Sequence, residues 1–118
     1  MDPHRGEKIA EALREELREI ITFEMGDPRL SGVEVTHVLL APGGRLARVL
    51  VALGGGEGEQ RESLAALEHA RRYLRQEVAR RLNLRRAPEL LFEADRWLHL
   101  PDRVDLLLKR AKKNPLIP

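Results

Sequence analysis

VEVTHVLLAPGGRLARVLVAL, residues 33–53, is the part of the chain that most narrows its fold. Residues 33–40 are rich in β-branched side chains, and residues 46–53 form a second apolar run, so both are expected to be strands. Ala41-Pro42-Gly43-Gly44 between them is a turn signal, which predicts an antiparallel hairpin. Alternation along the second strand predicts one fully apolar face that packs on helices: Ala47, Val49, Val51 and Leu53.

Helical periodicity flanks the hairpin on both sides. Over residues 5–24, apolar side chains recur at steps of three and four, as in an amphipathic helix, and residues 26–28 (Gly-Asp-Pro) end it. A second helical pattern covers about residues 60–84, a third strand is expected at residues 89–94, and a short last helix at residues 103–113. This order predicts a small α+β sandwich. The expected core residues include Leu13, Leu17, Val49, Val51, Leu74 and Val78.

The second helical pattern contains one conflict, at Arg71. In a straight helix Arg71 would lie inside the apolar stripe, and burial of an unpaired guanidinium is strongly unfavourable. Either the helix kinks near residues 70–72 and turns Arg71 outward, or Arg71 lies at the edge of the stripe with its charged group in water. The periodicity alone leaves both arrangements open.

Residues that carry catalytic or metal chemistry are absent or scattered. There is no Cys, the four His lie on different expected elements, and no Gly-Lys-Ser/Thr phosphate loop is present. We therefore expect no enzyme activity, no metal and no cofactor. The charged start of the chain lacks the pattern of a signal peptide and no apolar run has the length of a membrane span, so we expect a cytoplasmic protein.

Positive charge is concentrated in ARRYLRQEVARRLNLRR, residues 70–86, although the formal net charge of the 118-residue chain is only +2. Glu77 is the single acid among seven arginines there. A dense Arg surface favours a polyanionic partner, and nucleic acid is the first candidate because neutralised phosphates release counterions. Two Phe, one Tyr and one Trp are too few for an aromatic platform that reads single-stranded bases. The alternatives are a solvated helix face and a protein–protein interaction module that docks through the acidic first helix.

Several stretches, in order along the chain, resemble the ribosome-binding factor A family. They are residues 13–20 (LREELREI), 27–30 (DPRL), 33–36 (VEVT), 47–51 (ARVLV), 82–85 (LNLR), 88–92 (PELLF) and 103–105 (RVD). The resemblance covers nearly the whole chain. It implies a type II KH-like domain in the order α-β-β-α-kink-α-β, with a short C-terminal helix. The Ala-x-Gly kink of the family corresponds to Ala70-Arg71-Arg72, where arginine replaces the glycine.

The resemblance also implies a function. It predicts a non-enzymatic assembly factor that binds the free or immature 30S small ribosomal subunit and its 16S rRNA, supports late maturation and 5′-end processing, and is released by a maturation GTPase. A KH-like structural ribosomal protein is a further alternative. We expect a monomer with one RNA-binding domain at residues 1–108 and a basic, mobile tail at residues 109–118. The expected RNA-binding residues are Arg71, Arg72, Arg75, Arg80, Arg81, Arg85, Arg86, Lys109, Arg110, Lys112 and Lys113.

Overall fold

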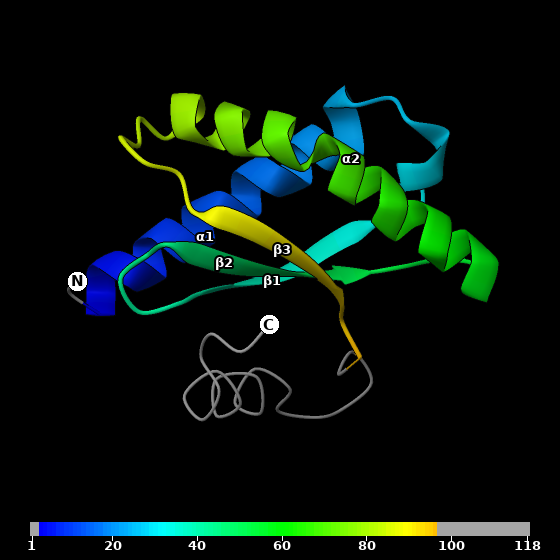
Figure 1. Ribbon diagram of the computed structural model, residues 1–118, viewed down its shortest axis with the longest axis horizontal. Coiled ribbons are helices and arrows are strands. Elements are labelled where there is room, and N and C mark those ends of the chain that lie inside the picture. Colours follow the sequence, from blue (N-terminus) through cyan, green and yellow to red (C-terminus); the bar gives the residue numbers. More distant parts are fainter. Residues whose placement is uncertain (1–2, 97–118) are drawn as a thin grey trace.

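The three-stranded sheet brings distant parts of the chain side by side. The structure, a computed structural model, describes residues 3–96 (Figure 1), so the helix expected at residues 103–113 lies outside it. β1 (Glu34–Leu40) and β2 (Leu46–Ala52) form the expected antiparallel hairpin, and β3 (Glu89–Ala94) pairs with β2 in parallel. A parallel pair needs a crossover connection, and the helix between β2 and β3 supplies it.

Helices cover one face of this sheet (Figure 1). α1 (Pro3–Glu19) continues into a short π-helix (Ile20–Glu24), and a 3-10 turn (Pro28–Leu30) follows. α2 (Glu57–Arg81) begins earlier than the expected residue 60, and its first turn carries Glu57 and Glu59, which interact favourably with the positive end of the helix dipole. The expected order of helix, strand, strand, helix and strand is confirmed over the described residues.

Side chains from both helices and from the sheet meet in one core. The six predicted core residues each have no exposed surface: Leu13, Leu17, Val49, Val51, Leu74 and Val78. β3 adds Leu90 and Phe92 to the same cluster, as its alternation requires. Truncation of a leucine in such a core to alanine typically costs about 2–5 kcal/mol, so this cluster is the main source of stability.

The expected kink in the second helix takes the form of a bend. α2 is one uninterrupted α-helix, and its axis changes direction near its middle (Figure 1). The buried stripe passes through Ala70, between Leu67 and Leu74. Arg71 lies beside the stripe, with 46% of its side chain exposed and its guanidinium 3.3 Å from the carboxylate of Glu68. The small side chain of Ala70 thus continues the apolar stripe, and Arg71 needs no burial.

Candidate nucleic-acid interface

The C-terminal end of α2 is built to change the direction of the chain sharply. Asn83 has the left-handed conformation (φ 54°), and the N–H of Leu84 donates to the carbonyl of Ala79 at 2.9 Å, five residues back. Asn83 N–H donates to the carbonyl of Arg80 at 3.4 Å. This pair of bonds is the Schellman motif, which satisfies the last carbonyls of a helix and tolerates Asn at its left-handed position. The turn leads directly to Arg85 and Arg86, both of which are exposed.

Arg75 closes this turn from inside. Its Nε and Nη2 donate to the carbonyl oxygen of Ala87 at 3.2 and 3.0 Å, and its Nη1 lies 2.9 Å from the carboxylate of Glu89. The side chain is 38% exposed. Arg75 is among the RNA-binding residues expected from the sequence; the structure also gives it a partner, because the tertiary fold places the carbonyl of Ala87 within its reach.

Arg81 is likewise held in place, half-buried among three carboxylates. Its guanidinium pairs with both oxygens of Glu24, one of them at 2.8 Å, and with Glu77 at 3.3 Å and Glu16 at 3.5 Å. The hydrogen bonds that Arg81 donates to Glu24 raise the pKa of Arg81, and the same contact lowers the pKa of Glu24 below its ordinary range. With 19% of its side chain exposed, Arg81 joins α2 to the end of the first helical segment and is poorly placed for phosphate.

Two further arginines have surface partners. Arg71 lies 3.3 Å from Glu68, and Arg80 lies 2.8 Å from Glu77 with 68% of its side chain exposed. The hydrogen bond that Arg80 donates to Glu77 raises the pKa of Arg80. Exposed ion pairs of this kind contribute about 0–1 kcal/mol, so either arginine can exchange its carboxylate for a phosphate at little cost.

Three predicted arginines remain exposed without a partner. Arg72, Arg85 and Arg86 make no hydrogen bond or ion pair with any other residue of the described part of the chain. Figure 1 shows the end of α2, the loop into β3 and the β1–β2 turn gathered at one end of the molecule. Arg85 and Arg86 lie on the loop at this end, and Arg72 lies farther back along α2. Exposed guanidinium groups without carboxylate partners favour a polyanion.

Arg45, in the β1–β2 turn, also belongs to this end of the molecule and was missed by the sequence analysis. Its carbonyl accepts a hydrogen bond from the N–H of Glu89 at 2.9 Å, because β2 and β3 start side by side. Its exposed side chain has no partner within residues 3–96. A single Arg in a turn gives no sequence signal, because no local sequence pattern encodes the parallel β2–β3 register that brings Arg45 beside the start of β3. We call Arg45, Arg72, Arg75, Arg85 and Arg86 the arginine surface.

Arg48, although central in the sheet, is not part of this surface. It is 6% exposed, and its Nε and Nη2 donate to the carboxylate of Glu93 at 2.6 and 2.8 Å across the β2–β3 pair. The hydrogen bonds that Arg48 donates to Glu93 raise the pKa of Arg48. Four further predicted site residues lie outside the described part of the chain: Lys109, Arg110, Lys112 and Lys113.

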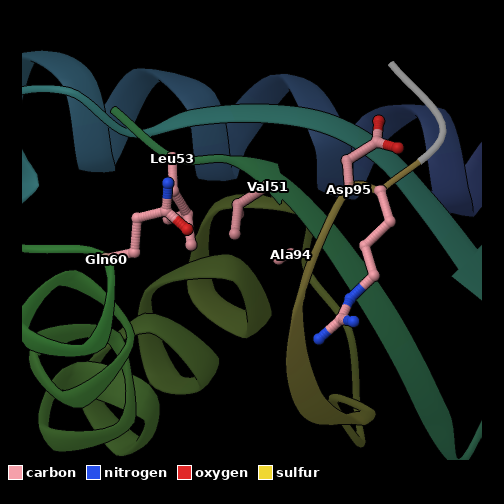
Figure 2. Close-up of a pocket in the computed structure, with 6 residues that line it drawn as sticks. Val51, Leu53, Gln60, Ala94 and Asp95 are labelled. Carbon is pink, nitrogen blue, oxygen red and sulfur yellow. The ribbon is translucent and has the colours of Figure 1, made fainter. Parts of the chain in front are cut away.

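A cavity of about 370 Å³ lies at the carboxyl ends of β2 and β3, beside the first turn of α2 (Figure 2). Val51, Leu53, Gln60 and Asp95 are among its lining residues. The carboxylate of Asp95 is 2.6 Å from the hydroxyl of Thr36 and is buried. This lining pairs no nucleophile with a base, and residues 3–96 contain no group of three His, Cys, Asp or Glu side chains placed to hold a metal. No helix in the same range is long and apolar enough to cross a membrane.

The order of elements, the parallel β2–β3 pair and the cationic end define a KH-like α+β domain. Comparison with known proteins identifies the family within this class. The model of the ribosome-binding factor A family matches residues 5–108. The chain is 50% identical over 113 residues to ribosome-binding factor A of Solibacter usitatus, covering 96% of this chain and 92% of that protein. The corresponding protein of Koribacter versatilis is 47% identical over 110 residues, covering 93% and 89%.

Solved structures agree with this assignment. A crystal structure of ribosome-binding factor A from Thermus thermophilus superposes with a TM-score of 0.59 at 33% identity, covering 77% of this chain and 92% of that one. Coordinates of the Thermus thermophilus factor fitted into a cryo-EM map of a 30S complex give a TM-score of 0.60 at 33% identity, covering 82% and 98%. The chain therefore belongs to the ribosome-binding factor A family, and the resemblance in the sequence is confirmed.

Proposed function

We propose that this protein binds the 30S small ribosomal subunit and contacts the phosphates of its 16S rRNA through the arginine surface. The observation that carries the proposal is a set of exposed arginines without partners in the described chain: Arg45, Arg85 and Arg86 where β2 and β3 begin, and Arg72 farther back along α2. The Thermus relative fitted into a 30S map supports the choice of partner. Each arginine that neutralises a phosphate adds affinity through release of counterions, without any need for a pocket.

The proposed role is that of a cytoplasmic assembly factor without catalytic activity. Binding to the free or immature subunit would favour the mature rRNA conformation and so support late maturation and processing of the 5′ end. A maturation GTPase would release the factor, which acts as a monomer. Lys109, Arg110, Lys112 and Lys113 are proposed to add phosphate contacts from the basic C-terminal segment.

Sedimentation of the protein with purified small subunits, large subunits and joined ribosomes tests this function. We expect the protein to sediment with small subunits at low salt, to leave them as salt rises, and to be absent from large subunits and translating ribosomes. Retention on translating ribosomes would instead indicate a permanent ribosomal protein. Binding that does not respond to salt would indicate an apolar protein–protein contact.

A further inference from the structure

The outer side of the second half of α2 carries a second set of exposed residues that the arginine surface does not explain. His69, Tyr73, Gln76 and Arg80 are all exposed or half-exposed and follow one another at steps of four, three and four. Residues at this spacing lie on one face of an α-helix. Arg72, three residues after His69 and four before Gln76, borders the same face. We call these five residues the α2 outer face; Arg72 belongs to the arginine surface as well, and Glu77, the ion-pair partner of Arg80, lies beside the face.

Tyr73 is the unusual member of this face. Within the described residues, Phe23 and Tyr73 are the exposed large hydrophobic side chains, whereas the aliphatic side chains of the sheet and helices are buried or half-buried. Tyr73 has 48% of its surface exposed and no hydrogen-bond partner within residues 3–96. Tyr73 and Arg80 are seven residues apart, two helical turns, and so lie on the same face of α2. An exposed aromatic ring on a helix face that also carries the exposed cation Arg80 is suited to a partner with both flat faces and negative charge.

We infer that the α2 outer face binds an unpaired RNA nucleotide, whose base stacks on Tyr73. The inference rests on the proposed function and adds to it the class of RNA that this face takes. Stacking on an aromatic ring suits any base, because every base has a π-face. Arg80, on the same face as Tyr73, and Arg72, at its border, can pair with neighbouring phosphates, while Gln76 offers an amide to a base edge. The imidazole of His69, one turn earlier, extends the stacking surface.

The low aromatic content predicted that the chain has no aromatic platform for reading single-stranded bases. The site proposed at Tyr73 is smaller than such a platform. One phenol and one imidazole hold one or two bases, so most of the affinity still comes from phosphate contacts. Double-stranded RNA keeps its bases stacked on one another and cannot use Tyr73 in this way. The α2 outer face should therefore distinguish a single strand from a duplex of the same charge per strand.

Two variants of the full-length protein separate stacking from simple apolar contact. Tyr73→Phe keeps the ring, and Tyr73→Leu keeps an apolar side chain but removes the flat surface. Phe23→Leu is the matched control, because Phe23 is 80% exposed and lies on the π-helix rather than on α2. Thermal melting of each variant establishes that it is folded before binding is compared.

The measurement is binding to a short single-stranded RNA that carries one 2-aminopurine, whose fluorescence is quenched when it stacks, and to the same strand in a duplex. We expect Tyr73→Leu to lose the quench and to weaken single-strand binding about 5- to 100-fold, the range for loss of one stacked base. Tyr73→Phe and Phe23→Leu should bind within about twofold of wild type. Equal binding of single strand and duplex, or an unchanged quench with Tyr73→Leu, would overturn the inference.

Failure of this inference and failure of the proposed function have different signatures. If Tyr73→Leu binds both the RNA strand and the small subunit as wild type does, the arginine surface alone carries the function and the stacking site is wrong. If wild-type protein quenches the RNA strand in a Tyr73-dependent manner but does not sediment with small subunits, the proposed function is wrong and the stacking site stands.

Discussion

The guanidinium of Arg75 donates two hydrogen bonds, of 3.2 and 3.0 Å, to the carbonyl oxygen of Ala87, twelve residues further along the chain. This contact ties the second half of α2 to the loop that leads into β3. The same loop carries Arg85 and Arg86, so Arg75 positions the arginine surface as well as belonging to it. Basic residues that look equivalent in the sequence therefore differ in the structure: Arg85 and Arg86 are exposed without a partner in the described chain, whereas Arg75 holds the loop in shape.

Reversal of charge at Arg75 should destabilise the fold more than reversal at Arg72. Arg75→Glu removes the donors to Ala87 and places a carboxylate beside Glu89, which we expect to cost about 1–3 kcal/mol. Arg72→Glu, on the exposed side of the same helix, should change the free energy of unfolding by less than about 0.5 kcal/mol. Urea denaturation of the two variants checks this. Equal midpoints would show that the Arg75–Ala87 contact adds nothing to stability.

The turn after α2 makes a second prediction, at Asn83. An L-residue in the left-handed conformation is destabilised sterically by about 1–2 kcal/mol, least for Asn, and the effect is absent for Gly. Asn83→Val should therefore lower stability by about 1–2 kcal/mol, whereas Asn83→Gly should leave it unchanged or slightly raised. Thermal unfolding of both variants is the measurement. A Val variant as stable as the Gly variant would contradict the Schellman geometry.

Acid should loosen the contact between α2 and the π-helix. Hydrogen bonds from Arg81 lower the pKa of Glu24, and those from Arg80 and Arg81 lower the pKa of Glu77, in both cases from an ordinary value of 4.5. A carboxyl whose pKa is lower in the folded state contributes stability that is complete above its unfolded pKa and is lost as the pH falls through the folded pKa. Stability should therefore fall as the pH drops below about 4.5.

The Glu24→Gln variant isolates this contribution. It should be less stable than wild type at pH 7, and the difference should shrink as the pH falls through the acid range, because wild type loses the same charge there. Urea midpoints at a series of pH values provide the comparison. If the difference in urea midpoint between wild type and Glu24→Gln is the same at every pH, the ionisation of Glu24 is not the source of its stabilising effect. Arg85→Ala, at an arginine without a described partner, serves as the control and should show no such pH dependence.

The buried pair of Arg48 and Glu93 should behave as a unit. Glu93→Leu alone leaves the guanidinium of Arg48 buried without its carboxylate, and we expect a loss of about 3 kcal/mol. The double variant Arg48→Met, Glu93→Leu replaces both charges with apolar groups and should recover much of that loss, since both desolvation penalties are removed. Chemical denaturation of both single variants and the double variant completes the cycle. Additive losses would show that the two side chains are not coupled.

Local sequence pattern was sufficient for most of the fold. The hairpin, β3 and the six core residues follow from period-two and period-3.6 spacing, which each segment carries within itself. The start of α2 was misplaced by the run of glycines before it, although Glu57 and Glu59 suit a first turn. The stripe through Ala70 was also missed, because an alanine gives a weak hydrophobic signal beside Leu67 and Leu74.

The candidate site was predictable as a region but not residue by residue. The Arg-rich segment was located from charge alone, yet the partners that remove Arg81 from the surface lie up to 57 residues away in the sequence, at Glu24. Arg45 joins the site through the parallel register of β2 and β3, which no local pattern encodes. Tertiary pairing, rather than charge density, decides which cations stay available.

The central claim is that the unpartnered arginines meet rRNA phosphates. Arg72→Glu combined with Arg85→Glu tests it with little effect on folding, because neither side chain has a partner in the described structure. Arg61→Glu is the control for Arg72→Glu: it makes the same charge change at an exposed position of the same helix, in its acid-rich first half. A general charge effect would act on both variants alike.

The most direct measurement is the dissociation constant of the small-subunit complex as a function of salt, for wild type, the double variant and Arg61→Glu. We predict that wild-type log affinity falls linearly with log salt, with a slope of about −0.7 to −0.9 for each phosphate neutralised. The double variant should bind more weakly with a slope shallower by about one such increment per arginine reversed, and Arg61→Glu should match wild type. Identical affinity and slope for wild type and the folded double variant would contradict the claim.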